Sequence, residues 1–76
     1  MMFYVTELAK RPDGVINSTI TARSSLALGL ALYYQRAAVA VTTTDFTGVA
    51  LTLQDEDGGI RLNEHFDTCY TPEQGE

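Results

Sequence analysis

The sequence contains a single cysteine, Cys69, and only five Lys and Arg residues against ten Asp and Glu. One cysteine cannot form an internal disulfide, which favours a reducing compartment over secretion. Phosphate neutralisation requires clustered Lys and Arg, so direct nucleic-acid binding is not expected. Residues 1–9 lack the basic start of a signal peptide. We therefore expect a cytoplasmic protein, located in the host cytoplasm if a phage encodes it.

Several functional motifs are also missing. No apolar run approaches the roughly 20 residues that span a bilayer, and no G-x-x-x-x-G-K phosphate loop occurs. His65 and Cys69 lie four residues apart, but a zinc site needs three or four ligands and no other Cys or His is present. A calcium loop that starts at Asp55 fails because Gly59 and Phe66 occupy ligand positions. We expect no cofactor, no metal, no membrane association and no enzymatic activity.

The sequence predicts one helix, over residues 24–36. Ser24 suits an N-cap, and the Leu and Ala residues that follow have high helix propensity. Arg36 near the far end complements the helix dipole. Gly29 costs about 1 kcal/mol relative to Ala, which indicates a close packing partner on that side.

Two leucines lie away from the main apolar face of this helix. At about 100° per residue, Leu28 and Leu32 fall nearly opposite the face that carries Leu26 and Leu30. Either curved strands or the C-terminal tail cover them, or they form a contact with a second copy or another protein. They are the candidate residues for self-association.

Alternating polarity and β-branched residues predict five strands around the helix, at residues 2–9, 15–23, 38–44, 49–54 and 60–66. The expected fold is a single α+β domain over residues 1–76 with the order ββαβββ, an antiparallel sheet with one helix packed on one face. Residues 67–76 are expected to form an irregular tail. The predicted core comprises Phe3, Val5, Ile16, Ile20, Leu26, Leu30, Tyr34, Val39, Val41, Leu51, Leu53, Ile60 and Leu62.

Charge divides unevenly along the chain. Residues 1–44 carry a net charge of +2, whereas residues 45–76 carry −7. Five carboxylates lie within or directly after the last two predicted strands and form a candidate partner-binding rim: Asp55, Glu56, Asp57, Glu64 and Asp67. Spaced carboxylates of this kind either fit a groove that binds phosphates or simply keep the protein soluble.

The strand-to-helix passage at residues 20–28, Ile-Thr-Ala-Arg-Ser-Ser-Leu-Ala-Leu, resembles an element of small phage-encoded anti-CRISPR proteins that inhibit type I systems. The order of a strand hairpin, one helix and a β-meander over residues 2–66 is similar as well. The resemblance implies binding to the crRNA-guided surveillance complex and a block of DNA recognition, by some members through an acidic, DNA-mimicking face.

Two functions follow as hypotheses. The first is a non-enzymatic inhibitor, an anti-CRISPR protein of this kind, whose acidic rim binds a protein partner with a basic nucleic-acid-binding surface. The alternative is a small homodimeric or assembly protein of phage or bacterial origin, joined through Leu28 and Leu32 on the apolar helix face.

Overall fold

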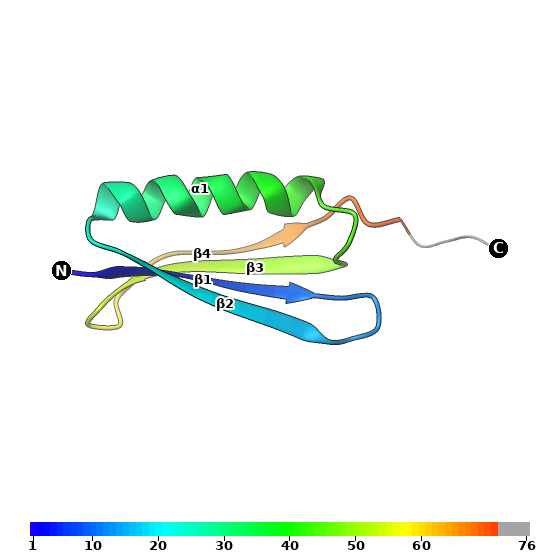
Figure 1. Cartoon of the computed structure of the whole chain (residues 1–76), viewed down its shortest axis with the longest axis horizontal. Helices are drawn as coiled ribbons and strands as arrows, with labels where there is room; N and C mark the ends of the chain where they lie inside the picture. The colour runs from blue at the N-terminus through cyan, green and yellow to red at the C-terminus, as the bar shows by residue number, and fades with distance from the viewer. Residues whose placement is uncertain (72–76) are drawn as a thin grey trace.

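A computed structural model describes residues 1–71 of the chain. Its elements are β1 (Phe3–Lys10), β2 (Ile16–Arg23), α1 (Leu26–Thr42), β3 (Gly48–Asp55) and β4 (Ile60–Asp67). The strands form one sheet in the order β2-β1-β3-β4, and all neighbours are antiparallel. The helix lies along one face of this sheet, and the opposite face is open (Figure 1). The predicted α+β class, an antiparallel sheet with one helix across one face, is confirmed.

Glycines close both hairpins of the sheet. Gly14 has φ +93° between β1 and β2, and Gly58 has φ +88° between β3 and β4. Residues with a Cβ rarely adopt this left-handed conformation, so the predicted turns form at these points. The strands on either side of each glycine are placed as expected, because their period-2 alternation fixes which residues share a face.

The core lies between α1 and the two central strands. Odd-numbered residues of β1 and β3 point toward the helix, and the even-numbered residues point to the open face. The buried apolar residues are Phe3, Val5, Ala9, Tyr33, Ala40, Val49, Leu51 and Leu53. Leu30 and Leu62, which were expected in the core, pack against this cluster partly buried.

The predicted strand over residues 38–44 is wrong, because α1 continues to Thr42. Alanines at 37, 38 and 40 favour helix, and Ala40 is buried in the core as part of this helix. A 17-residue helix is also about 25 Å long, which matches an eight-residue strand of about 26 Å. The order is therefore ββαββ. The N-cap is Ser25 rather than Ser24, and its Oγ accepts a hydrogen bond from the Leu28 N–H at 3.2 Å.

Several residues predicted in the core are exposed. A single helix covers one face of the sheet, so the even-numbered residues of the edge strand β2 have no cover. Tyr34 points away from the sheet, and its neighbour Tyr33 takes the buried position. The exposed residues that were predicted in the core are Ile16, Ile20, Leu26, Tyr34, Val39, Val41 and Ile60.

The C-terminal segment is irregular where the structure describes it. Asp67 is the last residue of β4, and residues 68–71 form neither helix nor strand. The Cys69 N–H donates to the Thr43 carbonyl at 2.9 Å, which ties this segment to the end of α1. Residues 72–76 of the predicted tail lie outside the described residues.

Candidate protein-interaction surfaces

Asp55 stabilises the turn between β3 and β4. Its Oδ1 accepts hydrogen bonds from the N–H groups of Gly59 at 2.8 Å and Asp57 at 3.0 Å. Arg61 lies 3.5 Å from Oδ2. The bond from the Gly59 N–H, more than any other contact, lowers the pKa of the Asp55 carboxyl below its ordinary value of 3.8. These hydrogen bonds engage Asp55 within its own turn. Because Asp55 is also only 8% exposed, it offers little surface to a partner.

Glu64 is also engaged within the fold. The Tyr33 hydroxyl donates to Glu64 Oε1 at 2.6 Å, which links the middle of α1 to β4. Burial of the Tyr33 ring, followed by this bond to a carboxylate, raises the pKa of the phenol. Glu64 therefore satisfies the one polar atom of the largest buried side chain.

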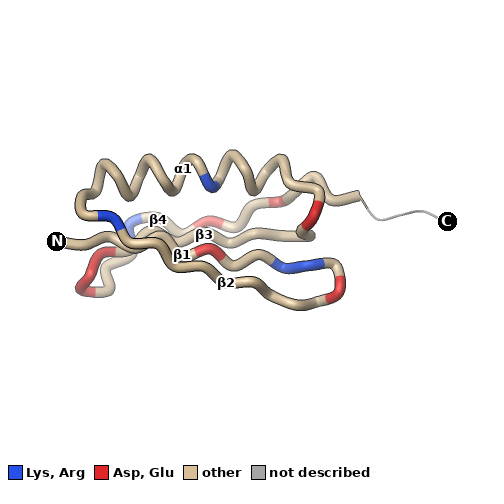
Figure 2. The backbone as a smooth tube through the Cα atoms, in the orientation of Figure 1, with Lys and Arg blue, Asp and Glu red and all other residues tan. Residues whose placement is uncertain are grey.

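The five predicted acidic residues do not lie together on one rim. Glu56 and Asp57 are exposed at the β3–β4 turn, whereas Asp67 lies at the opposite end of β4, where it pairs with Gly48. An eight-residue strand separates the two ends by about 25 Å. Figure 2 shows Asp and Glu at both ends of the sheet, with Lys or Arg close to the β3–β4 turn. Arg23 and Arg61 lie at that end of the sheet, so positive charge interrupts the acidic surface.

The two leucines predicted for self-association occupy different environments. Leu28 is 50% exposed, whereas Leu32 is partly buried and packs against the core. Leu32 also lines a groove of about 340 Å³ between α1 and β2. The structure therefore leaves Leu28 available for an intermolecular contact and uses Leu32 mainly within the chain.

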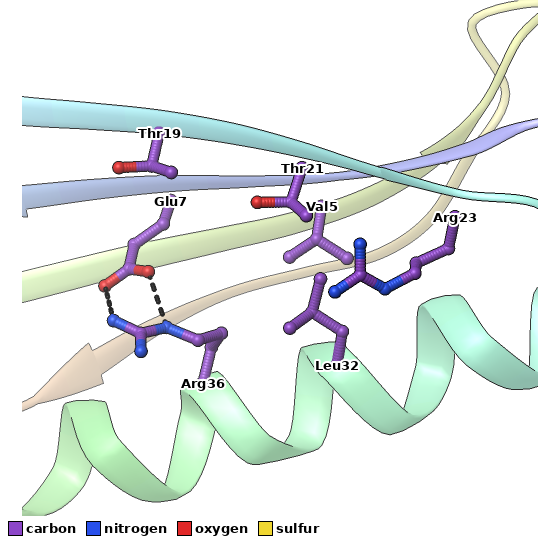
Figure 3. Close-up of a pocket in the computed structure, with 7 residues that line it drawn as sticks. All are labelled: Val5, Glu7, Thr19, Thr21, Arg23, Leu32 and Arg36. Atoms are coloured by element: carbon purple, nitrogen blue, oxygen red, sulfur yellow. Dashed lines mark hydrogen bonds and ion pairs between the residues drawn. The ribbon is translucent and has the colours of Figure 1, made fainter.

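An ion pair crosses this groove (Figure 3). The Arg36 guanidinium donates from Nε to Glu7 Oε1 at 2.9 Å and from a terminal nitrogen to Oε2 at 3.2 Å. The bond to Glu7 raises the pKa of Arg36. Thr19 and Thr21 from β2 line the opposite wall. Glu7 neutralises the charge of Arg36, whereas Arg23, the other cation that lines the groove, donates to the Ala22 carbonyl at 2.9 Å.

The side of α1 that faces away from the sheet carries no charge and is apolar apart from the exposed Gln35. We call this surface the outer face of α1 and define it as Ala27, Ala31, Tyr34, Ala38 and Val41, all of which are exposed. They lie opposite the buried residues Gly29, Tyr33 and Ala40. Sequence reasoning missed this face because it ended the helix at residue 36. The sequence feature that indicates this face is the spacing of these five residues, which alternates between four and three positions.

No metal site is apparent in the described part of the chain: among residues 1–71, no three His, Cys, Asp or Glu side chains lie close enough together to hold an ion. Cys69 is a free thiol on the surface, and its Sγ–H donates to the Val41 carbonyl at 3.1 Å. No helix of the described residues is long and apolar enough to cross a bilayer.

Comparison with known proteins found no matching family model, no matching curated protein and no matching solved structure.

Proposed function

We propose that this protein is a non-enzymatic protein-binding module that inserts the outer face of α1 into an apolar groove of another protein. The absence of charge on that face carries the proposal. Arg36 is the only charged residue between Leu26 and Thr42, and it points to the sheet, where it binds Glu7. Exposed apolar patches mark interaction sites on soluble proteins, and Tyr34 at the centre of this face is 59% exposed.

The spacing of the outer face fits docking against helices. Residues 27, 31, 34, 38 and 41 repeat every three or four positions, which aligns them in one stripe. Three of the five are alanines, so a partner backbone can approach closely. Tyr34 at the centre provides a large aromatic anchor, a residue type enriched among those that dominate binding energy.

The size of this face favours a groove over a flat contact. A helix of 17 residues is about 25 Å long and about 10 Å wide, so one face covers roughly 250 Å². A stable interface buries about 800 Å² on each partner. A groove also covers flanking residues such as Leu28 and Val39, which are 50% and 45% exposed, and therefore buries more of the chain than a single helix laid against the outer face. The partner is therefore a protein with a neutral, apolar groove.

The acidic rim has less geometric support. A partner with a basic nucleic-acid-binding surface, such as a CRISPR surveillance complex, would meet Glu56 and Asp57 at one turn but would find Asp55 and Glu64 engaged within the fold. DNA mimicry at this turn stays a prediction. We also propose a cytoplasmic location, where a reducing environment keeps the exposed thiol of Cys69 free.

Site-specific photo-crosslinking in the native cells tests the proposal. The photoreactive residue p-benzoylphenylalanine replaces Tyr34 in one variant and Asp57 in a second. We expect the photoreactive residue at position 34 to crosslink to one protein other than this chain. We expect that protein, once purified, to bind the wild type. Ala31→Glu with Ala38→Glu places two charges on the outer face and is expected to weaken this binding at least tenfold, about 1.4 kcal/mol.

The matched control is Thr44→Glu with Asn63→Glu, which adds the same charge at two exposed positions outside α1. It is expected to bind the partner like the wild type. Crosslinks from Asp57 alone would instead support the acidic-rim hypothesis. Crosslinks from Tyr34 only to another copy of this chain, or equal losses in both double variants, would overturn the proposal.

A further inference from the structure

The two edges of the sheet differ in how they meet solvent. The β4 edge carries Arg61, Glu64 and Asp67 and has a register shift opposite Leu53 and Gln54. Charges and bulges of this kind protect an edge from pairing with another strand. Along β2, by contrast, residues 16–22 include no charge and no proline, and the register with β1 is unbroken over eight pairs. The β2 edge therefore lacks these protections.

The backbone of β2 directs regularly spaced hydrogen-bonding groups away from the sheet. The Arg11 N–H donates to the Val15 carbonyl at 2.8 Å, so odd-numbered residues of the hairpin bond across it. The Thr47 N–H donates to the Lys10 carbonyl at 2.8 Å, in agreement with even-numbered residues of β1 facing β3. It follows that Ile16, Ser18 and Ile20 point their N–H and C=O groups to the open edge.

We propose that two copies of this chain pair antiparallel through β2 and form one continuous eight-stranded sheet. The strand is close to self-complementary, because Ile16-Asn17-Ser18-Thr19-Ile20 reads almost the same in both directions around Ser18. A two-fold axis at Ser18 places Ile16 of each copy directly opposite Ile20 of the other. Cross-strand pairs of β-branched residues stabilise antiparallel sheets, and this symmetry favours a second copy over an unrelated peptide.

Side-chain burial supports the same register. Ile16 and Ile20 are 59% and 69% exposed on the open face, and Leu8, which pairs with Ser18 in β1, is exposed beside them. Pairing at Ser18 joins these three residues from both copies into one apolar cluster across the axis. The exposure of the isoleucines falls in the pair, which provides the hydrophobic contribution to association.

Charge and symmetry limit the assembly to two copies. The acidic residues of the β3–β4 turn and of β4 lie across the sheet from β2, so the two −5 chains meet at uncharged strands. The sheet formed by residues 3–67 has one unprotected edge in each copy, and the pair uses both, so growth stops at the dimer. Both helices lie on the same face of the joined sheet with their outer faces free, so this inference is independent of the proposed function.

Light scattering and amide hydrogen exchange, both under reducing conditions, test this pairing. Over a series of protein concentrations, we expect the molar mass of the wild type to rise to twice the chain mass of 8.3 kDa at the highest concentrations. In the dimer the amides of Ile16, Ser18 and Ile20 are protected, and this protection disappears on dilution. The amides of Asn17, Thr19 and Thr21, which bond to β1, stay protected in both states. Contact through the helix cannot produce this alternation.

Ser18→Pro removes an outward N–H without breaking a bond to β1, and edge strands tolerate proline. It is expected to be a folded monomer. Asn63→Pro is the matched control, since the Asn63 N–H points outward at the β4 edge, and it is expected to remain dimeric. If Ser18→Pro does not fold, Ser18→Lys places two ammonium groups across the axis and is expected to weaken the dimer at least tenfold.

A wild type that stays monomeric at every concentration, a dimer that survives Ser18→Lys unchanged, or protection without the alternation would each overturn the inference. The Ala31→Glu and Ala38→Glu double variant separates it from the proposed function. That variant is expected to lose the partner and remain dimeric.

Discussion

At the scale of single residues, the carboxylates of Glu7, Asp55 and Glu64 serve structural roles. Asp55 fixes the β3–β4 turn through two backbone N–H groups, and Gly59 allows this close approach. A Cβ at position 59 would lie 2.7 Å from Asp55 Oδ2, which is closer than van der Waals contact. The acceptor role of Asp55 depends on its charge, because ionised carboxylates form the stronger hydrogen bonds to N–H donors.

Asp55 is expected to make stability depend on acidic pH. Its folded pKa lies below the ordinary 3.8, so its stabilising contribution is present above that value and is lost as pH falls through the folded pKa. Asp55→Asn should therefore lower the melting temperature at pH 7, and the difference from the wild type should shrink below pH 3.8. Thermal melts of both proteins from neutral to acidic pH measure it.

The exposed neighbour provides the control for this prediction. Asp57→Asn removes a carboxylate that is exposed at the same turn, while the backbone N–H on which Asp55 depends is kept. It is expected to melt close to the wild type at every pH. A pH-independent difference between Asp55→Asn and the wild type would contradict the role of the charge.

The roles of these carboxylates could be predicted only in part. The spacing of Asp55, Gly58 and Gly59 indicated a hairpin turn, and that turn is present. The bond between Tyr33 and Glu64 joins residues 31 positions apart. No local pattern encodes such a contact, because it depends on which face of β4 lies below the helix.

At the scale of elements, one close contact positions α1 over the sheet. A Cβ added at Gly29 would lie 3.1 Å from Leu53 Cδ1 and 3.3 Å from Phe3 Cβ. The helix backbone therefore approaches β1 and β3 more closely than a larger residue permits. The close packing partner that the sequence predicted at Gly29 is confirmed. Glycine lowers helix stability by about 1 kcal/mol relative to alanine, and the close packing of α1 on the sheet offsets this loss.

Replacement of Gly29 by valine is expected to lower the free energy of unfolding by about 2–3 kcal/mol, because Leu53 and Phe3 are both buried and overpacking forces them to move. Ala31→Val is the matched control on the exposed side of the same helix. It is expected to cost about 0.5 kcal/mol, the difference in helix propensity. Urea denaturation followed by circular dichroism measures both. Similar losses would show that the contact at Gly29 does not limit packing.

Element type was predictable where one pattern dominated. The four strands of the sheet show period-2 alternation or β-branched residues and are confirmed within a residue or two. Residues 38–44 combine alanines with Val39 and Val41, a composition that suits either helix or strand. The length of the sheet that α1 must cover decided the outcome, and that length is a tertiary property.

At the scale of the whole molecule, the core is small and lies on one side. Among residues 1–71, eight apolar residues of α1 and the central strands are buried where the two layers meet, and β2 lies at the edge with most of its residues exposed. The sequence predicted alternation in β2 correctly, but it placed Ile16 and Ile20 inward. Alternation defines two faces of a strand without stating which one is covered, so this choice required the position of the helix.

The difference between covered and exposed positions of the sheet predicts how much stability two aliphatic truncations remove. Leu51 is fully buried in β3, whereas Ile60 is 61% exposed in β4. A domain of this size is stable by roughly 4–11 kcal/mol, and a buried Leu→Ala change costs about 2–5 kcal/mol. Leu51→Ala is therefore expected to unfold at much lower urea, while Ile60→Ala stays within about 0.5 kcal/mol of the wild type. Equal losses, measured at one protein concentration, would mean that another surface covers Ile60 in solution.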